Sequence, residues 1–169
     1  MKSRNDAGGP CEKGRTMTIT TGLLIDYPAA LTPLVDLFET QWADWYNAQG
    51  ASARADLSER ARRNGLPLGL VALADGEVAG TCALTASSGG LVTERSPWLS
   101  GLVVLPQYRR RGAGRALLDR ARSEARRLGY GRLHALTESA TALFERAGWS
   151  RQEAAQINGV PHAIFTVTT

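Results

Sequence analysis

The chain has few cysteines and no long apolar run, the features on which small secreted proteins and membrane proteins depend. Its 169 residues include two cysteines and two histidines, and no apolar run is long enough to cross a bilayer. Cys11 and Cys82 lie far apart, so neither a disulfide framework nor a pair of zinc ligands is visible, which suits a reducing compartment. The first sixteen residues lack the apolar core of a signal peptide. We therefore expect a cytoplasmic protein with no membrane association and no bound metal.

The composition is that of one globular domain. Hydrophobic residues make up 43% of the chain and charged residues 21%, which is enough apolar surface for a real core. Residues 1–16 are polar and rich in glycine, so we expect a disordered tail there and a single domain over residues 17–169. The net charge of +4 leaves a basic nucleic-acid-binding module as a minor alternative. Aromatic and basic residues are poorly interleaved for that role, and we expect no nucleic-acid partner.

Periodicity and turn residues predict an α/β fold with the order β-α-α-β-β-β-α-β-α-β-β. Strands are expected at 18–26, 68–74, 78–86, 98–105, 132–137, 149–157 and 160–167, and helices at 32–46, 53–63, 112–128 and 139–147. Asp75-Gly76 and Asn158-Gly159 indicate two tight hairpins. Thr32 should cap the first helix, because Pro33 follows it. The strand–helix–strand unit from 98 to 137 should make a right-handed parallel connection.

The segment between the strand at 98–105 and the next helix has the features of an anion site. It carries, in order, Arg109, Arg110, Arg111, Gly112, Ala113, Gly114 and Arg115. The first amides of a helix have no intrahelical partner, glycines let a ligand approach them closely, and arginines add charge suited to phosphate oxygens. We interpret the segment as a pyrophosphate cradle, the alternative being a structural turn with surface arginines. No Gly-Lys-Ser/Thr follows the glycines, which excludes a P-loop.

In its motifs and order of elements, the chain resembles the GNAT superfamily of acyl-CoA N-acyltransferases. The family signature [RQ]-x-x-G-x-[GA] is matched by 109–114, after the apolar preface LVVLPQY. The later segment 142–149, ALFERAGW, resembles the second family signature, and the resemblance covers residues 18–169. It implies a mixed central β-sheet flanked by helices. A six-residue pattern alone would be weak, but its strand context and the second signature make it specific.

The resemblance also implies roles for individual residues. Leu102, Val103 and Val104 should offer strand backbone groups to the pantetheine arm of acetyl-CoA, and residues 109–115 should surround its pyrophosphate. The strands on either side of the signature helix should splay apart, with the thioester in the opening. Many members carry a tyrosine in the second signature that protonates the departing thiolate. Here that position is Phe144, which has no proton to give.

Glu138 is the candidate catalytic residue, because it follows the strand at 132–137, where the resemblance places the active-site opening. A carboxylate there can relay a proton from the amine through water. The alternative is a helix-start carboxylate favoured by the helix dipole.

The acceptor should enter over the first two helices. Trp42, Trp45, Tyr46 and Trp98 are candidates for the floor of its pocket. Core packing is the alternative for all four: helical spacing makes it at least as plausible for the first three, and it is equally open for Trp98, which begins the cofactor strand. We therefore predict an N-acetyltransferase that transfers an acetyl group from acetyl-CoA to a primary amine of a small molecule or a peptide N-terminus. A non-catalytic acyl-CoA sensor is the alternative that Phe144 keeps open. A homodimer is compatible with the prediction.

Several conspicuous residues are expected to be structural. Cys82 should be a buried strand residue rather than a nucleophile, and His134 and His162 should be packed and neutral. The arginines at 120, 122, 126 and 127 should form a solvated helix face. Asp36, Glu39 and Asp44 could attract a cationic amine, but a solvated acidic face is the simpler account.

Overall fold

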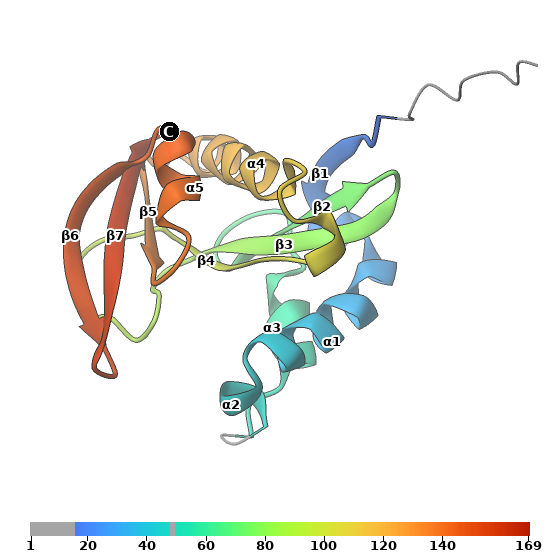
Figure 1. The fold of residues 1–169 in the computed structure, drawn as a ribbon, viewed down its shortest axis with the longest axis horizontal. Helices are drawn as coiled ribbons and strands as arrows, with labels where there is room; N and C mark the ends of the chain where they lie inside the picture. The colour runs from blue at the N-terminus through green and yellow to red at the C-terminus, as the bar shows by residue number, and fades with distance from the viewer. Residues whose placement is uncertain (1–15, 48–49) are drawn as a thin grey trace, which may run out of the picture.

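A computed structural model describes residues 16–47 and 50–169, so the expected tail at 1–16 lies outside the described residues except for Thr16. One seven-stranded sheet runs through the molecule in the order β1-β2-β3-β4-β5-β7-β6 (Figure 1). The strands are β1 Ile19–Leu23, β2 Leu68–Ala74, β3 Glu77–Thr85, β4 Trp98–Val104, β5 Arg132–Thr137, β6 Ser150–Ile157 and β7 Val160–Thr168. The helices are α1 Leu31–Gln41, α2 Ala43–Tyr46, α3 Ala53–Arg60, α4 Ala113–Arg127 and α5 Thr141–Arg146. Only β4 and β5 pair in parallel; the other neighbours are antiparallel, which confirms the mixed sheet.

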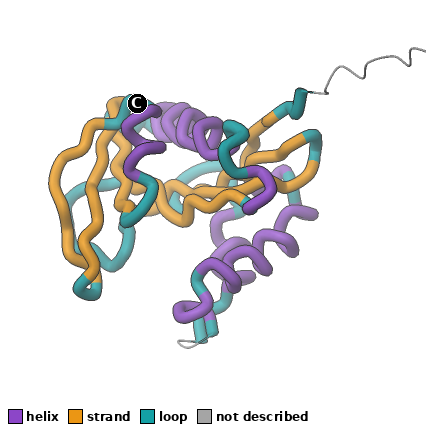
Figure 2. Tube along the Cα trace, viewed as in Figure 1, coloured by secondary structure: helices purple, strands orange, loops and turns teal. Residues whose placement is uncertain are grey.

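Helices cover both faces of the sheet. Helix α4 packs on β1, β2 and β3, while α1 and α3 pack on the opposite face, as the layers in Figure 2 show. All seven residues of β2 are therefore buried, and they alternate between two cores. Leu68, Leu70 and Ala72 join the α4 side, whereas Val71 and Leu73 join Leu34 and Phe38 on the other. Because side chains alternate along a strand, a continuous apolar run indicates a strand covered twice.

The apolar residues of α4 lie three and four positions apart and face the sheet. Leu117, Ala121 and Ala125 are fully buried, and the neighbouring Leu118 is buried with them. Two glycines flank this helix in the left-handed region, Gly112 with φ 91° before it and Gly129 with φ 88° after it. Both positions favour glycine, because a side chain strains the backbone at such φ values.

The first predicted helix is divided in the structure. A 3₁₀ turn at Pro28–Ala30 leads into α1, so Ala30 is the N-cap and the expected cap at Thr32 is wrong. Pro33 still lies in the first turn, where its missing N–H costs nothing. At Trp42 the backbone leaves the helical region (φ −126°, ψ 50°), and α2 starts anew at Ala43. Helical spacing across 34–46 did not reveal this break.

Both predicted hairpins are confirmed. Asp75 and Gly76 have φ values of 49° and 88°, and Asn158 and Gly159 have 51° and 79°. Two successive positive φ angles are those of a type I′ turn, which joins twisted antiparallel strands directly. The first strand is shorter than expected, because residues 24–26 form a 3₁₀ turn.

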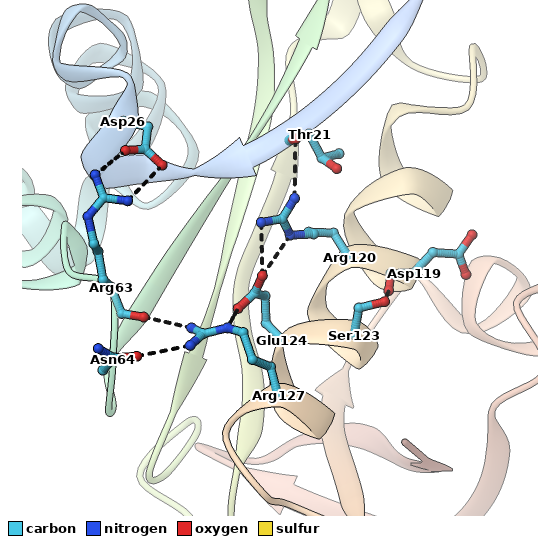
Figure 3. A network of polar contacts seen from close by, with 9 residues as sticks. All are labelled: Thr21, Asp26, Arg63, Asn64, Asp119, Arg120, Ser123, Glu124 and Arg127. Carbon is cyan, nitrogen blue, oxygen red and sulfur yellow. Dashed lines mark hydrogen bonds and ion pairs between the residues drawn. The ribbon is translucent and has the colours of Figure 1, made fainter.

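The buried carboxylate of Glu124 belongs to a network of polar contacts that joins α4 to the segment between α3 and β2 (Figure 3). Glu124 is 6% exposed and accepts hydrogen bonds from Arg120 and Arg127. Arg127 also donates to Asn64 and to the Arg63 carbonyl, 2.9 and 2.6 Å away. Arg120 is half-buried, which departs from the expected solvated face, whereas Arg127 is exposed as expected; both share the Glu124 carboxylate. Arg122 and Arg126 are exposed as expected.

Candidate active site

Strand β4 separates from β5 after two paired residues. Trp98 pairs with His134 and Leu99 with Ala135, and the parallel register stops there. On its other side β4 stays paired with β3 as far as Val104. In the described part of the chain, the β5-facing edge of β4 from Ser100 to Val104 thus has no strand partner. Its free N–H and C=O groups can hydrogen-bond an extended ligand laid along them.

A bulge lies where the two strands part. Ser100 pairs with Ala83 and Val103 with Thr81, so β4 carries one extra residue relative to β3. Gly101 sits in this bulge with φ 60°. A Cβ atom at Gly101 would lie 2.7 Å from Nη1 of Arg60. Glycine therefore allows both the positive φ of the bulge and the close approach of the arginine.

The loop after β4 contains a run of backbone amides without hydrogen-bond acceptors in the described structure. Arg110 and Gly112 both have positive φ, 60° and 91°, and α4 begins at Ala113. Within residues 16–47 and 50–169, no acceptor is hydrogen-bonded to the backbone N–H groups of 110–115. A turn of this kind at a helix N-terminus is an anion-binding geometry.

The arginines of this loop are not all directed alike. Arg109 donates from Nε to the Val104 carbonyl at 2.9 Å and so ties the loop to the end of β4. Arg115 pairs with Asp119, also at 2.9 Å, and donates to the Arg146 carbonyl. Arg110 and Arg111 are exposed. The structure thus brings 109–115 together around the loop, with the Arg115 guanidinium engaged between α4 and α5.

A cleft of about 810 Å³ opens on the other side of the bulge. One wall comes from the helices α1 to α3, and the other from the β3–β4 loop, β4 and the turn between β6 and β7. Its aromatic and charged lining residues are Phe38, Trp42, Trp45, Tyr46, Asp56, Glu59 and Arg60, and Ser100 and Gly101 of β4 complete the floor. Three of the four predicted acceptor residues therefore share one cleft.

The aromatic wall is a packed group centred on Phe38. Trp42 meets the Phe38 ring edge-on with centroids 4.9 Å apart, and Tyr46 lies against it at 6.1 Å. Trp45 is 53% exposed and remains available to a ligand. Trp98 is different: it is fully buried and donates its Nε1 hydrogen to the Arg95 carbonyl at 2.7 Å. Its predicted role in acceptor binding is therefore wrong, because no ligand reaches the ring.

The charged residues of the cleft come from α3, which sequence reasoning had not singled out. Asp56, Glu59 and Arg60 follow i, i+3, i+4 spacing, so they lie on one face of the helix. This spacing was the available signal. Tyr46 donates its hydroxyl hydrogen to Asp56 at 2.9 Å. Burial, and then the Asp56 carboxylate, raise the pKa of Tyr46 to about 12, so this phenol stays protonated.

Glu138 and Phe144 lie away from the cleft. Glu138 is exposed just after β5 and is not a cleft-lining residue, so its role as a proton relay stays a prediction. Phe144 is 2% exposed and stacks on Phe165 with centroids 5.3 Å apart. This residue of the second signature therefore belongs to the core.

Cys82 and His134 are packed, as expected from the sequence. The Cys82 thiol is buried, which raises its pKa to about 12 and keeps it unreactive. His134 Nδ1 lies 2.8 Å from the Thr166 hydroxyl, and the two share a hydrogen bond. Burial, and then the charges of Arg95 and Arg132, lower the pKa of His134 below its usual 6.5. Within residues 16–47 and 50–169 no three or more His, Cys, Asp or Glu side chains are grouped to hold a metal ion.

The lowered pKa of His134 makes stability depend on pH. As the pH falls from about 7 to 5, the unfolded chain takes up the proton before the native protein does, so the free energy of unfolding should decrease. His134→Asn should reduce this decrease in urea unfolding measured across that range. His162→Asn, at a half-buried site, is the control. An unchanged pH dependence in His134→Asn would contradict the assignment.

Comparison with known protein families shows to which family the chain belongs. The profile of the acetyltransferase (GNAT) family matches residues 34–149, which run from within α1 to the end of the second signature. The chain belongs to the GNAT acetyltransferase family. The expected family and fold are thereby confirmed. No curated protein matches the chain in a sequence search.

Solved structures agree with the GNAT fold. An aminoglycoside 6′-N-acetyltransferase complexed with coenzyme A superposes with a TM-score of 0.71 at 15% identity, over 89% of this chain and 96% of its own. The yncA protein of Salmonella typhimurium with acetyl-CoA gives 0.65 at 23%, over 90% and 94%. Ard1 of Thermoplasma volcanium gives 0.64 at 15%, over 91% and 98%. None of the helices in the described GNAT domain is long and apolar enough to traverse a bilayer.

Proposed function

We propose that this GNAT protein is an N-acetyltransferase that moves an acetyl group from acetyl-CoA to a primary amine in the cleft beneath α1–α3. The observation that carries the proposal is the position of Gly101. It belongs to the bulge at the open edge of β4 and also lines the cleft, so one point of the backbone faces both a cofactor strand and an acceptor pocket. Direct transfer between two ligands requires such a junction.

The residues present fit coenzyme A. The N–H groups of 110–115 would receive the pyrophosphate, with the positive end of α4 behind them. Gly114 lies against α5, where an added Cβ would come 3.2 Å from a Leu143 methyl, so this helix start is closely packed. The free edge of Leu102, Val103 and Val104 would hold the pantetheine amides as an added strand does. The bound thioester supplies the activated acetyl group.

The protein's own chemistry concerns the amine. A protonated amine has no lone pair, so the cleft must accept its proton. Glu59 is an exposed carboxylate that lines the cleft, whereas Asp56 already accepts the hydrogen bond of Tyr46. We therefore assign proton removal to Glu59, through water, in preference to Glu138. A backbone N–H at the bulge would polarise the thioester carbonyl.

The proposal is tested by thiol release from acetyl-CoA in the presence of a panel of primary amines. Amine-dependent release, together with a thermal shift on adding CoA, is expected. A CoA-induced shift with no release for any amine would support the sensor alternative that Phe144 keeps open. Stabilisation by duplex DNA at physiological salt, with none by CoA, would overturn the proposal altogether.

Proton removal is tested by exchanging carboxylates for amides. Glu59→Gln should lower kcat/KM about tenfold at neutral pH and shift the pH profile, a smaller loss than for a base in direct contact, because water carries the proton. CoA affinity should not change. Glu145→Gln, on the exposed face of α5, is the control. A shifted profile in Glu138→Gln with an unchanged one in Glu59→Gln would return the role to Glu138.

A further inference from the structure

Arg60 occupies an unusual place at the end of α3. Its guanidinium carbon lies 5.3 Å from the centroid of the Phe38 ring, and its Nη1 lies 2.7 Å from the position that a Cβ of Gly101 would take. Its own Cβ and carbonyl pass 3.0 Å from the position that a Cβ of Gly69 would take. Two glycines on two strands thus leave room for one arginine, which holds its charge over the bulge at the floor of the cleft.

Arg60 has no ion-pair partner among the residues that the structure describes. Arg63, Arg95, Arg115, Arg120 and Arg127 each pair with a carboxylate. For Arg60, no carboxylate of the described residues lies within 4.0 Å of the guanidinium, although Asp56 is one turn away on the same helix. A half-buried guanidinium has five donors in a rigid fork, and its natural partner is a planar carboxylate bound through two hydrogen bonds.

Resting on the proposed function, we propose that Arg60 binds a carboxylate of the acceptor, and that the substrate class is an α-amino acid with an apolar side chain. The guanidinium adjoins the bulge where the amine must be acetylated. A carboxylate held close to the amine, as on the same carbon atom, would suit both places. Trp42 and Trp45, which the buried Phe38 ring supports from behind, would hold the side chain.

The charges around this point match a zwitterion. Asp56 and Glu59 lie on the same face of α3 as Arg60, so the cleft offers negative groups to the ammonium form and one positive group to the carboxylate.

Three acceptors that differ in one group test the proposal: phenylalanine, phenylalaninamide and phenethylamine. Each is titrated calorimetrically into the full chain with CoA present, and each is assayed by thiol release. Phenylalanine should bind, and should exceed the other two in affinity and in kcat/KM by about ten- to a hundredfold, the value of a charge-assisted hydrogen-bonded pair. Equal or weaker use of phenylalanine, or no binding of it, would overturn the proposal.

Variants of Arg60 test whether this side chain causes the preference for phenylalanine. Arg60→Met should erase the difference between phenylalanine and phenylalaninamide, and Arg60→Lys should keep part of it, because an ammonium lacks the fork. Arg54→Met removes an exposed arginine of the same helix and should behave as the wild type. A preference that survives in both Arg60 variants contradicts the proposal. Calorimetric binding tests the role of Arg60 even if no thiol is released. If none of the amines causes thiol release, that result counts against the proposed function alone.

Discussion

Replacing Gly112 by valine should weaken CoA binding by at least about a hundredfold. Gly112 has φ 91° at the N-cap of α4, a conformation that a β-branched residue does not adopt without strain. The loop would have to change its backbone, and the amides at 110–115 would no longer converge. Losing two charge-assisted hydrogen bonds to a pyrophosphate costs about 3 kcal/mol or more, which corresponds to that loss of affinity. Calorimetric titration with CoA measures it.

Gly129 provides the matched control for this variant. It lies at the opposite end of α4 with φ 88°, and an added Cβ would meet open space there just as at Gly112. Gly129→Val should therefore carry a similar backbone strain, and a similar decrease in Tm, with unchanged CoA affinity. If both variants bind CoA equally well, the amide loop is a structural turn and the cofactor assignment is wrong.

The fold was predictable because its signals are local. The type I′ turns at Asp75-Gly76 and Asn158-Gly159 set the hairpins, and the buried stripe of α4 follows from residues three and four apart. The bounds of β5 agree with the sequence to the residue. The break at Trp42 was not predictable, since it depends on how the chain turns from α1 toward α3, and the apolar spacing continues through it.

The two halves of the site differ in how far sequence reasoning reached. The amide loop is contiguous in the chain, so its motif and its geometry coincide. The cleft is assembled from α1, α2, α3, β4 and two loops, and contacts at that sequence separation leave no local pattern. Arg60 illustrates the limit: as a sequence it is one arginine among many, and its position beside Gly69 and Gly101 emerges only when β2 and β4 lie under α3. Trp98 shows the opposite error: the sequence suggested a ligand contact, but the side chain is fully buried.

Replacing Glu124 by glutamine should lower the free energy of unfolding by about 2–3 kcal/mol. Removing one partner of a buried ion pair typically costs 3–5 kcal/mol, because the remaining charge stays uncompensated. The loss is smaller here, since the side chains of Arg120 and Arg127 are 31% and 43% exposed and retain water. For a domain of this length the change should lower Tm by roughly 5–10 °C. Urea unfolding and calorimetry measure both quantities.

The same helix supplies the comparison that tests why Glu124 matters. Asp119 pairs with Arg115 at i, i+4 with both side chains more than half exposed, 57% and 51%. Asp119→Asn should therefore cost only about 0.3–0.5 kcal/mol, as exposed helix pairs do. Glu124→Gln should also keep its affinity for CoA, because the network joins the far end of α4 to Asn64 and not to the amide loop. If the two variants lose equal stability, the buried carboxylate contributes no more than a surface ion pair, and packing alone holds α4 in place.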